Sequence, residues 1–231
     1  MNSSVLPLIV SFSGIDGAGK TTQIEYLRQS LEASGAKVDL IRFWDDVATL
    51  KCFREASSHA LFKSESGVGT PDRPVNRQDK NIQTWYMTPI RLFLYLLDSL
   101  HLNLIVRRAK RSSADVVIFD RYIYDELANL NLAGSMCQRL YAKWALRWTR
   151  SPDAAILLDA DPAHARARKP EYPLDFLIRN REAYLDLSIM TPVMKVIRAQ
   201  SIGAAAAEIY GISMQMDSDR AMERVEITNA T

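Results

Sequence analysis

Residues 14–21 read Gly-Ile-Asp-Gly-Ala-Gly-Lys-Thr and fit the pattern G-x-x-x-x-G-K-[ST]. The apolar run at 6–12 comes directly before this stretch, and Ile24, Leu27 and Leu31 follow it at helical spacing. Glycine has no Cβ, so the backbone N–H groups of such a turn can converge on one anion, and the start of the following helix adds its positive end. The stretch therefore predicts a phosphate-binding loop between a strand and a helix, with a glycine turn that holds no ligand as the alternative.

Two side chains of this loop have distinct predicted roles. The Lys20 ammonium can reach the β- and γ-phosphates of a nucleoside triphosphate, and the Thr21 hydroxyl can bind Mg²⁺. The residues expected to hold the nucleotide are Gly14, Asp16, Gly17, Ala18, Gly19, Lys20, Thr21 and Thr22.

Apolar β-branched runs alternate with helical patterns along the whole chain. Strands are predicted at 6–12, 38–43, 116–119, 154–158 and 193–199, and helices at 21–34, 47–62, 85–110, from about 125, 135–150, 174–188 and 202–210. The predicted strands lack polar alternation, which is typical of a parallel sheet covered by helices on both faces. We therefore expect an α/β fold with one domain over residues 1–210 and a polar, loosely packed tail over 211–231.

A second motif stands at the end of the strand predicted at 116–119, where Asp120 and Arg121 follow directly. In open α/β sheets, ligands bind outside the carboxyl ends of the strands. An aspartate there can hold Mg²⁺ directly or through water, and the planar fork of an arginine can clamp a phosphate. A surface ion pair is the alternative interpretation of these two residues.

A third motif, at 163–170, reads Ala-His-Ala-Arg-Ala-Arg-Lys-Pro and carries three cations in four residues, Arg166, Arg168 and Lys169. Such a segment suits a mobile lid, here expected at about 161–173, that closes on the nucleotide phosphates and excludes water. The alternative is a basic face exposed to solvent.

Composition excludes several other classes of protein. The net charge is +2, from 29 basic and 27 acidic residues, so no global positive field is available to bind nucleic acid. Cys52 and Cys137 form neither a disulfide framework nor a CxxC metal pair. The first residues lack the basic region of a signal peptide, and the most apolar predicted helix carries Arg91, Asp98 and His101. We therefore expect a soluble cytoplasmic protein without nucleic-acid or membrane partners.

The three motifs together resemble the thymidylate kinase family of P-loop nucleoside monophosphate kinases. The resemblance rests on GIDGAGKTTQ at 14–23, Asp-Arg-Tyr at 120–122 and the basic segment at 163–170, and it extends over residues 5–200. It implies a three-layer P-loop NTPase fold with a parallel sheet wrapped by helices. It also implies transfer of the γ-phosphoryl group of ATP to dTMP, a requirement for Mg²⁺, and a homodimer formed through long helices.

The resemblance also implies roles for single residues. Gly14–Thr22 would cradle the donor, Asp16 would contact the acceptor, and Arg121 would contact a phosphate. Family members without an arginine in the loop carry catalytic arginines in the lid, and this chain has Ala18 in the loop. The residues expected to be catalytic are therefore Lys20, Arg121, Arg166 and Arg168, and those expected to hold Mg²⁺ are Thr21 and Asp120.

Departures from the family pattern concentrate on the acceptor side. Arg42 matches an arginine of the family's T-R-E-P-G-G segment, but the rest of that segment is replaced. The family has an Asp-Arg pair on the long helix, whereas Asp98 is followed here by Ser99. Asp125 and Glu126 stand where the family has serines, and their charges would repel a phosphate. The residues expected to contact the acceptor are Asp16, Arg42, Asp98, Arg121 and Tyr122.

These departures leave the acceptor open. The first interpretation is phosphoryl transfer to dTMP or a related nucleotide. The second is a kinase of deoxynucleosides or other small molecules, and the third is an ATP-binding module without kinase activity. The loop 66–77, which contains Arg73 and Arg77, could supply replacement contacts or be an ordinary surface loop.

Overall fold

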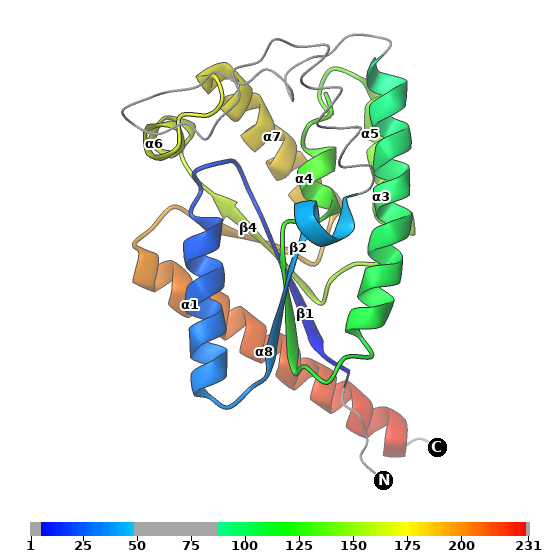
Figure 1. The fold of residues 1–231 in the computed structure, drawn as a ribbon, viewed down its shortest axis with the longest axis vertical. Helices are drawn as coiled ribbons and strands as arrows, with labels where there is room; N and C mark the ends of the chain where they lie inside the picture. Colours follow the sequence, from blue (N-terminus) through cyan, green and yellow to red (C-terminus); the bar gives the residue numbers. More distant parts are fainter. Residues whose placement is uncertain (1–5, 49–86, 230–231) are drawn as a thin grey trace.

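The sheet of this protein has five parallel strands in the order β2-β3-β1-β4-β5 (Figure 1). The computed structural model describes residues 6–48 and 87–229. The strands are β1 (Leu8–Ser13), β2 (Val38–Arg42), β3 (Val116–Asp120), β4 (Ala154–Asp159) and β5 (Met194–Arg198). Because β1 pairs with both β3 and β4, the order of the strands reverses beside β1, at the carboxyl end of the sheet where ligands of such folds bind.

Helices cover both faces of the sheet (Figure 1). One face carries α1 (Lys20–Ala33) and α8 (Ile202–Asn229), and the other carries α3 (Met87–Ala109), α4 (Ile123–Leu127), α5 (Met136–Trp148) and α7 (Leu174–Met190). Alternation along β1 serves both layers, because Leu8, Val10 and Phe12 pack toward α1 while Ile9 packs toward the other face. The predicted α/β fold with a covered parallel sheet is confirmed.

Two short elements lie near the carboxyl ends of the strands. A π-helical turn, η1 (Phe43–Val47), follows β2, and α6 (Pro162–Arg168) follows β4. The helix predicted at 47–62 and the loop 66–77 lie, apart from Val47 and Ala48, outside the described residues.

The C-terminal segment differs from the loosely packed tail that we expected. Residues 211–229 continue α8 without a break. The Ser213 side chain is fully buried, and Arg220 donates to the Leu6 carbonyl oxygen at 2.9 Å and lies 3.4 Å from Asp153. This part of the chain therefore belongs to the layer that covers the sheet.

Helix α3 is the long apolar helix that the sequence predicted. Its segment Pro89–Ala109 is long and apolar enough to cross a membrane by length and composition alone. In the structure, however, Leu102 and Val106 are fully buried in the core, and so is the carboxyl-bearing Asp98. Part of the apolar surface of α3 thus packs into the core of the protein.

Candidate active site

The glycine-rich loop joins β1 to α1 and lies against the ends of the neighbouring elements. Gly17 has φ +84°, and a Cβ built on it would lie 2.2 Å from the Ala165 carbonyl oxygen of α6. Gly14 has φ +141°, and its Cβ would lie 2.7 Å from the Leu158 carbonyl oxygen of β4. Only glycine fits at these two positions, because any side chain would push α6 or β4 away from the loop.

Lys20 opens α1 with its ammonium group turned back onto the loop. Its Nζ donates to the carbonyl oxygens of Gly14 at 2.6 Å and Ile15 at 2.9 Å, and the side chain is buried. Burial and, to a smaller extent, the nearby Arg121 cation lower the pKa of Lys20 to about 7, although surrounding carboxylates oppose the shift. The loop therefore holds a cation that would gain from a phosphate placed beside it.

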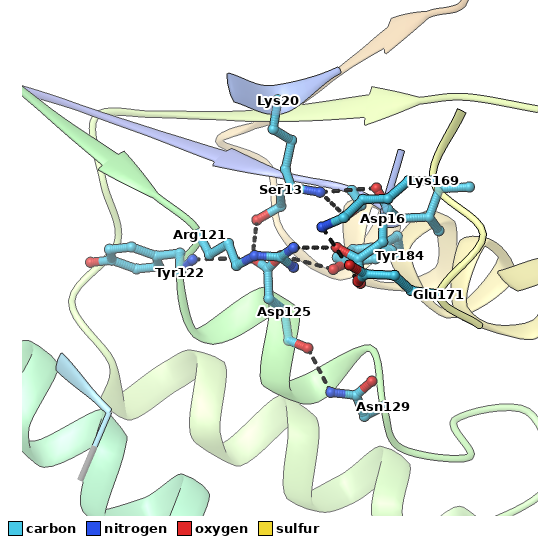
Figure 2. Close-up of polar contacts among 12 residues, drawn as sticks. Ser13, Asp16, Lys20, Arg121, Tyr122, Asp125, Asn129, Lys169, Glu171 and Tyr184 are labelled. Carbon is cyan, nitrogen blue, oxygen red and sulfur yellow. Dashed lines mark hydrogen bonds and ion pairs between the residues drawn. The ribbon is translucent and has the colours of Figure 1, made fainter. Parts of the chain in front are cut away.

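Arg121 lies between two carboxylates (Figure 2). Its guanidinium forms a short ion pair with Asp16 and donates to Asp125 Oδ1 at 3.1 Å. Burial by itself would lower the pKa of Arg121, but the charges of Asp16 and Asp125 outweigh it and raise the pKa. The backbone of Arg121 has φ +73°, a conformation that non-glycine residues rarely adopt, and its N–H donates to the Phe12 carbonyl oxygen at 3.0 Å. Strain of this kind is found at functional sites, where the surrounding contacts hold it in place.

Asp125 organises the buried side of this cluster. It is 3% exposed and accepts hydrogen bonds from Ser13 Oγ at 2.7 Å, the Tyr184 hydroxyl at 2.8 Å and the Tyr122 N–H at 3.1 Å, besides the one from Arg121. Burial and the Asp125 charge raise the pKa of Tyr184, so its hydroxyl remains a proton donor. The sequence analysis expected the charge of Asp125 to repel a phosphate. In the structure, donors of the protein itself satisfy this carboxylate.

The predicted lid is α6 followed by a turn, packed directly against the loop. Ala165 is fully buried beside Gly17. Arg166 is half-buried, and its Nε donates to the Tyr172 carbonyl oxygen at 3.1 Å, whereas Arg168 is exposed. The segment thus lies where a cover over the phosphates would lie, and whether it moves remains a prediction.

The two residues expected to hold Mg²⁺ lie on the loop side of the sheet. Thr21 is exposed in the first turn of α1, and Asp120 is half-buried at the end of β3, opposite Phe12 of β1. Asp120 is close enough to Lys20 for its charge to raise the pKa of that group. Within residues 6–48 and 87–229, no group of three or more His, Cys, Asp or Glu side chains could hold a metal. A hydroxyl and one carboxylate nevertheless suit Mg²⁺, which takes few protein ligands and completes its shell with phosphate and water.

The residues that the sequence predicted to contact the acceptor differ in their exposure to solvent. Arg42 is exposed at the end of β2, opposite Asp120. The Tyr122 side chain is fully buried and points away from the cluster, with its hydroxyl donating to the Arg150 carbonyl oxygen (Figure 2). Asp98 is fully buried in α3. Both side chains are fully buried in this structure, and the expectation that Tyr122 and Asp98 contact the acceptor stays a prediction.

Three polar residues of the site were missed by the sequence analysis. Ser13 and Tyr184 bind Asp125, and the buried Glu171 lies 3.3 Å from the Lys169 ammonium (Figure 2). A signal existed for one of them: Asn180 and Tyr184 are polar residues, four apart, on the otherwise apolar buried face of α7. Polar groups on such a face must find hydrogen-bond partners inside the protein.

Comparisons with known proteins decide the family. The chain is 34% identical over 215 residues to the thymidylate kinase of Bifidobacterium longum (strain DJO10A), covering 87% of this chain and 95% of that relative. The chain belongs to the thymidylate kinase family. The thymidylate kinase of Solidesulfovibrio magneticus is 28% identical over 228 residues, covering 89% of this chain and 98% of the relative. No family model matches the chain.

A solved structure agrees with this assignment at the level of the fold. The crystal structure of thymidylate kinase from Ehrlichia chaffeensis matches with a TM-score of 0.56 at 22% identity, over 90% of this chain and 98% of that chain. Family membership makes the chain a nucleotide kinase, a phosphotransferase that uses ATP.

Proposed function

We propose that this thymidylate kinase family member transfers the γ-phosphoryl group of ATP to dTMP. The observation that carries the proposal is the buried Lys20 in a glycine loop at the end of β1, in a chain 34% identical to a named thymidylate kinase over 87% of its length. Catalysis would come mainly from holding donor and acceptor in line and from stabilising charge on the transferring group.

Donor binding would use Gly14–Thr22. In this account the Lys20 ammonium exchanges the carbonyl oxygens of Gly14 and Ile15 for the β- and γ-phosphates, which binds it more strongly because those oxygens are charged. Arg166 and Arg168 of α6 would add charge from the covering side, where Ala165 already contacts the loop. Closure of this segment would exclude water from the reaction.

Magnesium would sit between Thr21 and Asp120, whose hydroxyl and carboxylate oxygens fit its ligand preference. When bound, the ion would neutralise oxygens of the triphosphate. The protein's own contribution is the placement of these two groups at the carboxyl ends of β1 and β3, which are adjacent strands.

Acceptor binding would use Asp16, Arg121 and Arg42. Arg121 would contact the acceptor phosphate, for which it must share its guanidinium with Asp16 and Asp125. Ser99, which replaces the family's arginine, is buried and donates to the Tyr95 carbonyl oxygen at 2.8 Å. The family's arginine is missing at Ser99, and Arg121 is already paired with two carboxylates. A deoxynucleoside, whose reacting hydroxyl is uncharged, is therefore the second candidate acceptor.

We also infer a cytoplasmic homodimer. The outer faces of α3 and α5 expose large apolar side chains, which monomers rarely gather on one surface. They are Ile90, Phe93, Leu100, Leu104, Met136, Leu140, Trp144 and Trp148. A second copy packed on these helices would remove them from water.

The decisive experiment offers the purified protein ATP and Mg²⁺ with dTMP, dUMP or thymidine and measures ADP release. We expect turnover with dTMP, and none in Lys20→Ala. Lys37→Ala, which removes an exposed cation far along the chain from the loop, is the matched control and should keep full activity. Turnover with thymidine alone would replace dTMP by the second candidate, and normal turnover in Lys20→Ala would overturn the proposal altogether.

A further inference from the structure

A cavity lies beside the segments that lead into β4 and β5. Its volume is about 580 Å³, within the range of small-molecule sites. Thr149 and Ser151 come before β4, and Thr191 and Val193 come before β5, so the cavity reaches the amino ends of these strands. The glycine loop follows the carboxyl end of β1, which runs parallel to β4, as β4 does to β5, whereas only Tyr122–Tyr124 of the cavity lining follow the carboxyl end of a strand, β3.

The lining of this cavity carries one sign of charge. Arg139, Lys143 and Arg147 are spaced four apart on α5 and so share one face of that helix, and Arg150 follows the helix end. Among the described residues, no aspartate or glutamate lines the cavity. Four cations around one hollow, without a carboxylate between them, produce a local positive potential in a protein whose net charge is only +2.

Two threonines of the lining have unsatisfied hydroxyl groups. Thr149 and Thr191 are each 6% exposed, and the Oγ1 atom of each has no hydrogen-bond partner within the part of the chain that the structure describes. Leaving such a buried group unpaired destabilises the fold. The cavity also has apolar wall, from Leu146, Val193 and the highly exposed Ile189. A site that combines cations, hydroxyl groups without hydrogen-bond partners and an apolar surface is suited to an anion that also has an organic part.

We propose that this cavity binds a small molecule that carries a chain of phosphates, separate from the nucleotide held by the glycine loop. The cations of α5 would contact the phosphates, and the Thr149 and Thr191 hydroxyls would donate to phosphate oxygens. The chemistry is shared by inorganic polyphosphate and by nucleoside triphosphates, whose organic part would pack on Ile189 and Val193. This inference does not depend on which acceptor the kinase site uses.

One residue joins this cavity to the kinase site. Tyr122 lines the cavity and donates its hydroxyl to the carbonyl oxygen of Arg150, while its backbone N–H donates to Asp125, which holds Arg121. A ligand that moved Arg150 would therefore act on the contacts of Arg121 through one side chain.

The test uses inorganic tripolyphosphate and isothermal titration calorimetry on the full chain. We expect two molecules per wild-type chain, and one in either Lys20→Ala or Lys143→Gln/Arg147→Gln. The control is Arg28→Gln/Lys37→Gln, which removes two cations that do not line the cavity and lowers the net charge equally. Binding of a single molecule to the wild type would overturn the proposal. An equal loss of affinity in Lys143→Gln/Arg147→Gln and in the control would also overturn it, because general charge attraction would then explain the binding.

Two further variants and a second probe make the outcome sharper. Thr149→Val keeps the shape of the side chain and removes the unpaired hydroxyl, so the fold should stay as stable while the affinity of the cavity falls a few-fold. An unchanged affinity would refute the role of that hydroxyl. The affinity for ATP in the Lys20→Ala background distinguishes a nucleoside triphosphate from inorganic polyphosphate. If ATP binds more tightly than tripolyphosphate, the apolar residues of the cavity contact an organic group. If the two bind equally, the cavity recognises the phosphate chain alone.

Discussion

The hydrogen bonds of Asp125 make a quantitative prediction about stability. Its Oδ1 accepts from Arg121 and Tyr184, and its Oδ2 accepts from Ser13 and the Tyr122 N–H, at distances from 2.7 to 3.1 Å. Asp125→Ala would leave these four donors without this acceptor in a largely buried part of the protein. Breaking a buried charge pair costs roughly 3–5 kcal/mol, and we expect a loss in that range.

Asp125→Asn should cost less, because the amide keeps one acceptor oxygen. The amide nitrogen can donate to the Ser13 hydroxyl, which also accepts hydrogen bonds, so only the Tyr122 N–H and the charge attraction to Arg121 are lost. Hydrogen bonds to charged groups contribute about 1.5–3 kcal/mol, which sets the expected loss for this variant.

Urea denaturation followed by tryptophan fluorescence measures both free energies of unfolding. Asp39→Asn, at an exposed position of β2, is the matched control and should change stability by less than about 0.5 kcal/mol. If Asp125→Asn and Asp125→Ala were both as stable as this control, the cluster around Arg121 would not be held by Asp125, and the reasoning about the buried side of the site would be refuted.

Three further predictions concern the loop and the end of α8. Gly17→Ala should detach α6 from the loop and raise protease sensitivity there, because its Cβ would lie 2.2 Å from the Ala165 carbonyl oxygen. Gly203→Ala is the control, because open space surrounds that position and its sensitivity should not change. Equal protease sensitivity of the two variants would contradict the contact between the loop and α6. Because the pKa of Lys20 is lowered to about 7, that group is mostly neutral at pH 8.5, and ATP binding should take up close to one proton there and weaken as the pH rises from 7 to 10. Calorimetry in buffers of different ionisation enthalpy measures this uptake, and its absence would contradict the buried cation. Arg220→Ala should lower the free energy of unfolding by about 1 kcal/mol in urea titrations, since it removes a hydrogen bond to a backbone carbonyl; no change would mean that the end of α8 contributes nothing.

The C-terminal half of α8 could have been found from the sequence, although we expected a loose tail. Ile209, Ile212, Ser213 and Met216 follow one another at helical spacing, and all of them pack toward the sheet. The polar residues between them hid this pattern, because the sequence does not show that the sheet face beside α1 needs a second helix to cover it. That need arises only when the five strands are assembled.

The sequence by itself determined the five strands, the longer helices of the described residues, the glycine loop and the Asp-Arg pair at the end of β3, because these depend on spacing and residue type within short stretches. It did not predict the short helix α6 within the lid segment. Tertiary structure alone decided which side chains meet. Tyr122 stands next to Arg121 in the chain, yet it is buried in the core and bound to Arg150, whereas Tyr184 reaches Asp125 from 59 residues away in the sequence. Neighbours along a chain can point to opposite sides of the backbone, and a buried polar group binds whatever partner the packing brings within reach.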